Sequence, residues 1–99
     1  MQTHSKTKSS FYRRLYVAHL ISIGVNTVPK ITQLSGMPRR TAQDTIVALE
    51  ELAIRCEFIG AKKDGGYTIN DWGAINPQWV IAQLADICTV LQYPLPSPN

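Results

Sequence analysis

The first forty residues of this 99-residue chain contain no aspartate and no glutamate, although they hold seven lysines and arginines. Residues 41–99 carry three lysines and arginines against seven acidic residues, a net charge of −4. This separation favours a chain with one side that faces a polyanion, although a solvated face joined to a basic tail gives the same pattern.

Long apolar runs and cysteine pairs are also missing. No segment approaches the roughly 18 apolar residues that a membrane helix needs, and the N-terminus has no apolar region typical of a secretory signal. The two cysteines, Cys56 and Cys88, form no C-x-x-C pair, which argues against a zinc site. Both lie in apolar segments, which favours buried thiols in a reducing cytoplasm.

The residues that catalysis needs are equally absent. There is no Gly-x-Ser-x-Gly and no His-Glu-x-x-His, and the glycines and lysines of residues 60–66 lack the Gly-Lys-Ser/Thr of a phosphate-binding loop. His19 faces an apolar stripe and is interpreted as a packed side chain. We therefore expect no enzyme, no metal and no cofactor.

Two helices are predicted in the first part of the chain. The first begins at Ser9 or Ser10, is apolar over much of its circumference, and stops at Gly24. The second is short, with Thr27 as N-cap and Gly36 as its stop.

A third helix opens at Met37-Pro38 and runs to about Ala53 or Ile54, because its apolar residues recur at helical spacing. The period then changes to two, which predicts a β-hairpin that turns at residues 62–66. A last helix starts at Asn76-Pro77, with Trp72 and Trp79 as core anchors beside it. Residues 93–99 are rich in proline and predict an extended tail.

The segment from Thr27 to Leu52, followed by an alternating strand and the return Gly66-Tyr-Thr-Ile-Asn-Asp-Trp-Gly73, resembles the small winged helix-turn-helix DNA-binding regulators of bacteria or phages. The resemblance covers residues 27–73. It implies an α+β, mostly helical fold with a three-helix core, a β-hairpin wing and a C-terminal helix. The expected boundaries are a flexible basic tail over 1–8, the domain over 9–92 and the Pro-rich tail over 93–99.

In such a domain the third helix enters the major groove with its first turns. The polar residues at its start are then the candidate readers of bases: Arg39, Arg40, Thr41, Gln43 and Asp44. Arginine pairs with guanine, glutamine with adenine, and threonine bonds phosphate or touches a thymine methyl. Asp44 has three open roles: accepting from cytosine, pairing with Arg40, or being tolerated at the groove edge.

Other cations are candidates for phosphate contact. Thr27 and Lys30 begin the short helix, whose N-terminal dipole attracts phosphate, and Lys62 and Lys63 lie at the tip of the hairpin, where the resemblance implies a further contact. Sequence-independent attraction is expected from four more cations: Lys6, Lys8, Arg13 and Arg14.

The last helix predicts a second interface. Its apolar residues Val80, Leu84, Ile87 and Leu91 repeat at spacings of four, three and four, as in a coiled coil, and the first helix is also broadly apolar around Leu15. One small domain has difficulty covering both faces, so a homodimer through the terminal helices is expected, although part of the stripe packs on the domain's own core.

These observations together predict a sequence-specific transcription regulator, a repressor, that binds duplex DNA in the cytoplasm as part of the nucleoid. Two alternatives remain open. One is a protein–protein interaction module on a winged-helix scaffold, because fold alone does not fix function. The other is an architectural DNA binder of low sequence specificity.

Overall fold

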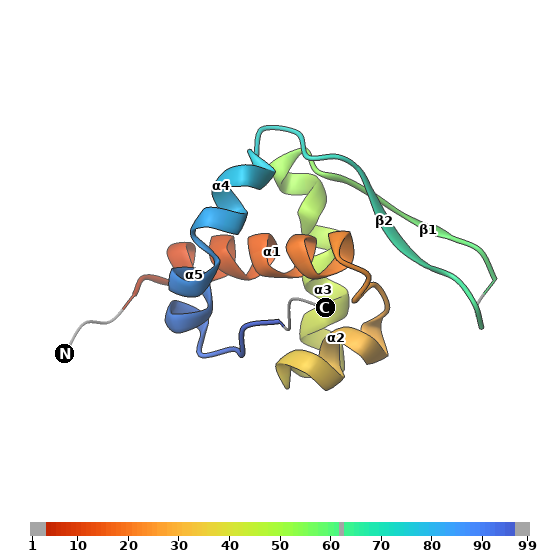
Figure 1. Cartoon of the computed structure of the whole chain (residues 1–99), viewed down its shortest axis with the longest axis horizontal. Helices are drawn as coiled ribbons and strands as arrows, with labels where there is room; N and C mark the ends of the chain where they lie inside the picture. The colour runs from red at the N-terminus through yellow and green to blue at the C-terminus, as the bar shows by residue number, and fades with distance from the viewer. Residues whose placement is uncertain (1–3, 62, 97–99) are drawn as a thin grey trace.

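The computed structural model describes residues 4–61 and 63–96. Five α-helices, a short 3-10 helix and a two-stranded antiparallel sheet follow one another along the chain (Figure 1). This arrangement confirms the expected α+β, mostly helical fold with a hairpin after the third helix. The elements, with their bounds, are α1 Lys6–Ser22, α2 Val28–Ser35, α3 Arg39–Ala48, η1 Leu49–Leu52, β1 Arg55–Ile59, β2 Gly66–Asp71, α4 Pro77–Ala82 and α5 Leu84–Leu91.

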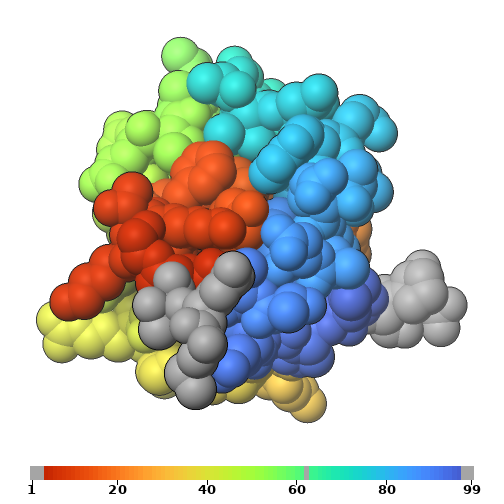
Figure 2. All heavy atoms as spheres, turned by 90° about the vertical axis from the view of Figure 1, so that its left-hand side faces the viewer, coloured from red at the N-terminus to blue at the C-terminus, as the bar shows by residue number. Residues whose placement is uncertain are grey.

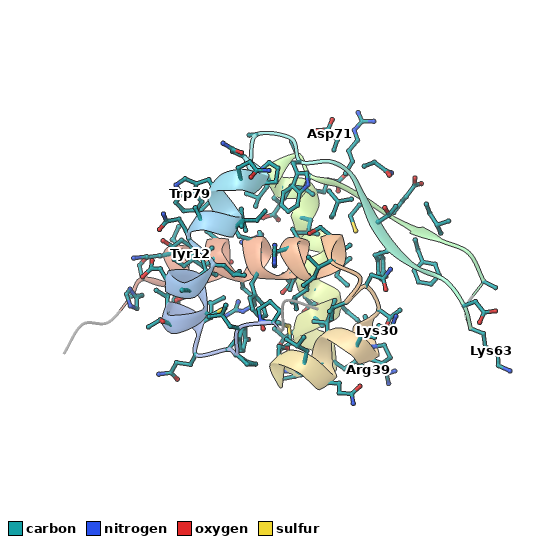
Figure 3. The ribbon with its side chains drawn as sticks, viewed as in Figure 1. Tyr12, Lys30, Arg39, Lys63, Asp71 and Trp79 are labelled. Carbon is teal, nitrogen blue, oxygen red and sulfur yellow. The ribbon has the colours of Figure 1, made fainter. Side chains whose placement is uncertain are left out.

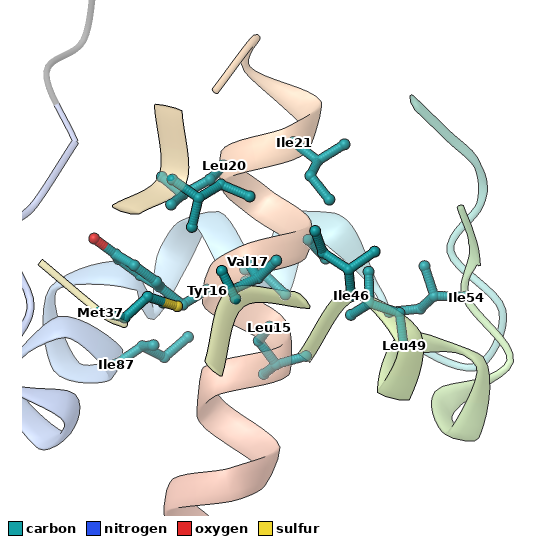
Figure 4. Packing of buried hydrophobic residues seen from close by; sticks show 14 of the residues in the cluster. Leu15, Tyr16, Val17, Leu20, Ile21, Met37, Ile46, Leu49, Ile54 and Ile87 are labelled. Carbon is teal, nitrogen blue, oxygen red and sulfur yellow. The ribbon is translucent and has the colours of Figure 1, made fainter. Parts of the chain in front are cut away.

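Helix α1 is the central element of the fold. Its seven consecutive residues 15–21 are all buried, so the helix is enclosed around its whole circumference. Figure 4 shows Leu15, Val17 and Leu20 among side chains from α3, α5 and the loop before α3. A fully buried aliphatic side chain of this kind contributes about 1.5–3 kcal/mol of stability relative to an exposed one.

The start of α1 differs from the sequence-based expectation. The helix begins at Lys6 and is capped by Ser5, whose hydroxyl accepts from the Lys8 backbone N–H at 3.0 Å. Residues 6–8 therefore belong to a helix, and the predicted tail over 1–8 is too long. The reason is that several serines in this segment can each cap a helix, and composition alone does not rank them.

The turn between α2 and α3 follows the local signals. The Thr27 hydroxyl accepts from the Lys30 N–H at 3.2 Å, and Gly36 ends α2 in the left-handed region at φ 80°. Met37 is buried directly after this glycine, and Pro38 precedes the first residue of α3. The α-helix ends at Ala48, where the chain tightens into η1 rather than continuing as α-helix to residue 53.

The hairpin is anchored to the helices through Asn26. The Tyr67 N–H of β2 donates to the Asn26 carbonyl at 2.8 Å, and the Asn26 side-chain amide donates back to the Tyr67 carbonyl at 3.2 Å. A Cβ at Gly66 would lie 2.5 Å from the Asn26 amide nitrogen, so a larger residue there would displace the Asn26 side chain from this contact. The loop before α2 therefore fixes where the hairpin starts to project.

The expected single C-terminal helix is two helices. The helical conformation is interrupted at Gln83, which has φ −100° and ψ 8°. Helix α5 then runs from Leu84 to Leu91. Trp72 is half-buried against the core, whereas Trp79 is 43% exposed and is not the core anchor that we predicted. No glycine or proline marks this break, so it could not be predicted from local residue types.

The burial of the terminal helices corrects the residues assigned to a dimer surface. Leu15, Val80 and Ile87 are 0% exposed and Leu84 is 9% exposed within the single chain. Val80, Leu84 and Ile87 are buried because the two helices α4 and α5 fold over α1, which contributes Leu15 (Figures 1 and 2). Only Leu91 of the predicted set remains half-buried at the edge of the core.

The segment after α5 packs on the core instead of extending freely. The Tyr16 hydroxyl donates to the Pro94 carbonyl at 2.9 Å, and the rings of Tyr16 and Tyr93 lie 5.1 Å apart. Both cysteines are free thiols, Cys88 buried and Cys56 half-buried, as expected. Within the described ranges 4–61 and 63–96, no helix has the length and apolar character needed to cross a membrane.

Candidate nucleic-acid interface

Helix α3 has a buried face and a solvent-facing one. Ala42, Thr45 and Ile46 are buried against the other helices, which fixes the orientation of α3 in the fold. The outer face carries residues that lie three and four positions apart and are therefore neighbours on the helix surface. These exposed residues are Arg39, Arg40, Gln43, Asp44, Val47 and Glu50.

The outer face divides into two rows. Gln43, Val47 and Glu50 form one row, and the last two of these side chains line a groove of about 650 Å³ between α3 and the hairpin. Arg40 and Asp44 form the other row, on the side where Asp44 helps to line a hollow of about 330 Å³ against α1. The two rows thus form one ridge with the hairpin on one flank and α1 on the other.

Arg40 and Asp44 are loosely paired. Arg40 Nε lies 3.9 Å from Asp44 Oδ2, and the two side chains are 92% and 75% exposed. An exposed pair at this distance contributes little to stability, at most about 0.5 kcal/mol. Both groups therefore stay available to an external partner. Thr41 is half-buried beside the α1 flank, so it offers less surface than its neighbours.

A second cluster of cations lies between α2 and the hairpin. Lys30 and Lys63 line opposite sides of a groove of about 570 Å³, together with Thr27 at the start of α2 and the aromatic residues Phe58 and Tyr67. The two rings meet edge to face, with centroids 5.1 Å apart, and stiffen the hairpin at this point. This groove is bounded by the amino end of α2, whose dipole favours an anion.

The labelled cations gather in one part of the molecule. In Figure 3, Lys30 and Arg39 extend toward the lower edge of the molecule, and Lys63 lies at the far end of the hairpin. Lys30 reaches back to Asn26, with 3.5 Å between Nζ and Oδ1, but is exposed. Lys62, the other predicted cation of the tip, lies outside the described residues.

The predicted cations of α1 have different environments. Lys6 and Lys8 are exposed on the first turn. Arg14 is instead held within the protein, because it donates to Glu51 at 2.9 Å and to the Ala48 carbonyl at 3.3 Å. Its guanidinium therefore stabilises the carboxyl end of α3 and is not a free phosphate-binding group.

Charge changes sign along α3. The helix begins with Arg39 and Arg40 and is followed by Glu50 and Glu51 in η1, all with exposed side chains. A phosphate is attracted at the first end and repelled at the second. This gradient favours approach of a polyanion to the amino end of α3 over approach to η1.

Val47 is a surface residue that sequence reasoning missed. Its side chain is 75% exposed in the last turn of α3, between Gln43 and Glu50 in the same row. The signal was present in the sequence, because Val47 lies four residues after Gln43 and so shares its face.

The titratable groups with displaced pKa values are buried or half-buried, and one of them, Cys56, lines the groove between α3 and the hairpin. Burial lowers the pKa of His19 and raises the pKa of the Cys56 and Cys88 thiols. Burial also raises the pKa of Tyr16 strongly, with smaller contributions from Cys88 and Tyr93. All four are thus held in their neutral forms. Among the residues that the structure describes, no group of three His, Cys, Asp or Glu side chains is arranged to hold a metal.

Comparison with known proteins identifies the class. A family model described as winged helix-turn helix matches residues 6–91, so the chain belongs to this family. The family and the fold indicate DNA binding.

A solved structure extends the comparison. The chain is 32% identical to a DUF2131 family protein from Shewanella amazonensis SB2B, with a TM-score of 0.85 over 92% of this chain and 91% of that chain. No curated protein matches the sequence.

Proposed function

We propose that the protein is a sequence-specific duplex-DNA-binding transcription regulator that acts as a repressor, by occupying its site on cytoplasmic, nucleoid DNA. The observation that carries the proposal is the ridge of α3, where Arg39, Arg40 and Gln43 are exposed on a helix held rigidly by its buried face. Arginine and glutamine side chains at the start of such a helix can pair with guanine and adenine in the major groove.

The flanks of the ridge support a phosphate-binding role. Lys30 and Lys63 border one groove, so the amino end of α2 and the hairpin can each neutralise a phosphate of the same duplex. The Thr27 hydroxyl accepts from the Lys30 N–H and Pro29 carries no N–H, so phosphate contact at this end of α2 comes from the Lys30 ammonium and the helix dipole. In this proposal the bases are read by Arg39, Arg40, Thr41 and Gln43, with Asp44 beside them at the groove edge, while the cations of α2 and the hairpin set the register.

The test begins with selection of bound duplexes from a random pool, followed by affinity measurements on the selected site. Arg39→Ala and Arg40→Ala should each weaken binding about tenfold or more and relax the preference at one base pair. Arg55→Ala is the matched control, because Arg55 is an exposed arginine at the start of β1, beyond the far end of α3.

A salt titration separates the rival functions. Phosphate neutralisation makes the affinity for duplex fall steeply with salt concentration. Absence of duplex binding at low salt would favour a protein–protein module. A steep salt dependence with equal affinity for all sequences would favour an architectural binder.

We also propose that the protein acts as a homodimer through its terminal helices, since two-fold symmetry presents two α3 helices to a palindromic site. With most of the predicted stripe used in the core, the apolar surface left for a partner is Leu91 together with Trp79 and Ile81 of α4. Ile81→Lys should then produce a monomer in sedimentation. A wild-type monomer at high micromolar concentration would remove this part of the proposal.

A further inference from the structure

Val47 is the most exposed of the large apolar side chains in the described parts of the chain. Its exposed fraction is 75%, against 57% for Leu95 and 56% for Ile59. A β-branched residue in an exposed helix is less favourable than alanine, because the helix restricts its side-chain rotamers. Neither local helix stability nor core packing accounts for valine here.

The side chains around Val47 limit the kind of partner surface that can contact it. Gln43 and Glu50 lie one turn before and one turn after it in the same row, and Asp44 lies on its other side. On its inner side Val47 borders the groove between α3 and the hairpin, which also contains Ile46 and Ile54. On the outer surface of α3, however, its isopropyl group stands alone among polar side chains, and this exposed apolar area is too small for an apolar protein interface. The partner surface that complements Val47 and its polar neighbours presents a single methyl group surrounded by hydrogen-bonding groups.

The major groove of DNA offers that partner. The C5-methyl group of thymine is the one apolar group that a base pair presents there, next to the acceptors and donors that glutamine and arginine read. We propose that Val47 is a specificity-determining residue that contacts a thymine methyl group when α3 lies in the major groove. This inference rests on the proposed DNA-binding function and adds a base identity to it.

The geometry of the helix places the thymine. Four residues of α-helix advance about 6 Å, which is close to two base-pair steps of about 3.4 Å. Val47 therefore meets a base pair one or two steps from the pair that Gln43 contacts. Glu50 follows Val47 by three residues, and its carboxylate repels the phosphate backbone of the DNA beyond that point. Val47 is thus the last residue of the row that reads a base.

The experiment removes the methyl group alone. In the duplex selected by the full chain, each thymine is replaced in turn by deoxyuridine, and the affinities of wild type, Val47→Ala and Leu95→Ala are measured. Leu95 is the control because it is exposed and lies outside α3, the hairpin and the proposed dimer surface. Wild type and Leu95→Ala should lose about fourfold at one thymine, the factor expected for burial of one methyl group. Val47→Ala should bind the thymine and deoxyuridine duplexes equally.

Val47→Ala is expected to fold, because it replaces an exposed valine by a better helix former. If wild type binds its selected duplex but no thymine shows a methyl dependence that Val47→Ala removes, the inference is overturned while DNA binding stands. A selected site without a required thymine overturns it in the same way. If no duplex is selected, both the inference and the proposed function fail.

Discussion

Arg14 Nη2 lies 2.9 Å from Glu51 Oε1, and this ion pair joins α1 to η1 at the end of α3. The same guanidinium donates through Nε to the Ala48 carbonyl, the last residue of the α-helix. The Arg14 side chain is 20% exposed, whereas that of Glu51 is 70% exposed. Arg14, the less exposed partner, therefore contributes most to holding α1 and α3 at a fixed angle.

Replacing Arg14 by alanine should lower the free energy of unfolding by about 1–2 kcal/mol, because a charge-assisted hydrogen bond and the capping of Ala48 are both lost. Glu51→Gln should cost no more than about 0.5 kcal/mol, because the exposed carboxylate is screened by water. Urea denaturation measures both values. Equal losses for the two variants would contradict the view that Arg14 acts mainly on the helix end.

Two glycines should respond differently to alanine. Gly36 has φ 80° with open space around it, so Gly36→Ala carries only the backbone penalty of about 1–2 kcal/mol. Gly73 has φ 60°, and a Cβ there would overlap the Ala53 carbonyl. Gly73→Ala should therefore cost about 3 kcal/mol, since strain and steric overlap add.

Thermal or urea unfolding of the two variants gives the comparison. Gly36→Asn serves as the control, because asparagine tolerates the left-handed region and should recover part of the loss. A Gly36→Ala variant less stable than Gly73→Ala would show that the contact between Gly73 and Ala53 is not tight in solution.

His19 makes the stability depend on pH. Burial lowers its pKa in the folded protein below the ordinary value of 6.5, so the unfolded chain binds the proton more readily. The contribution of the neutral imidazole is therefore complete above pH 6.5 and is lost as the pH falls through the folded pKa. His19→Gln should show a smaller loss of stability than wild type between about pH 7 and pH 5. Parallel curves for the two proteins would exclude this role of His19.

Much of the fold was predictable because its signals are local. Thr27 and Gly36 bound α2 through a side-chain cap and a left-handed glycine, and alternation after residue 54 marks the hairpin. The predictions that were wrong depended either on a choice between equivalent local signals or on tertiary packing. Ser5 and Ser9 are equally good caps, and Gln83 breaks a helix without any residue that requires a break.

The terminal apolar stripe shows why a surface cannot be read from periodicity. Val80 and Ile87 have the spacing of a coiled coil, but α4 and α5 use them to enclose α1. Periodicity says that a face is buried and does not say against what. Val47 is a different case, because its position four residues after Gln43 already placed it on the exposed face of α3.

Asp44 is the acidic residue within α3, and we expect its carboxylate, beside Arg40, to repel phosphate when the helix is out of register. Asp44→Asn should therefore bind random duplex about threefold more tightly, because an exposed unfavourable charge is removed. Its affinity for the selected duplex should change less, so that the ratio between selected and random duplex falls. Competition binding with both duplexes measures the ratio.

Asp86→Asn is the matched control, because Asp86 is an exposed acid on α5, away from α3. It carries the same change of net charge and should leave both affinities almost unchanged. The opposite outcome for Asp44→Asn, a loss of tenfold or more confined to a duplex with a required cytosine, would mean that Asp44 accepts a hydrogen bond from that base. Asp44 would then be a direct reader of sequence, with Arg40 as the group that orients its carboxylate.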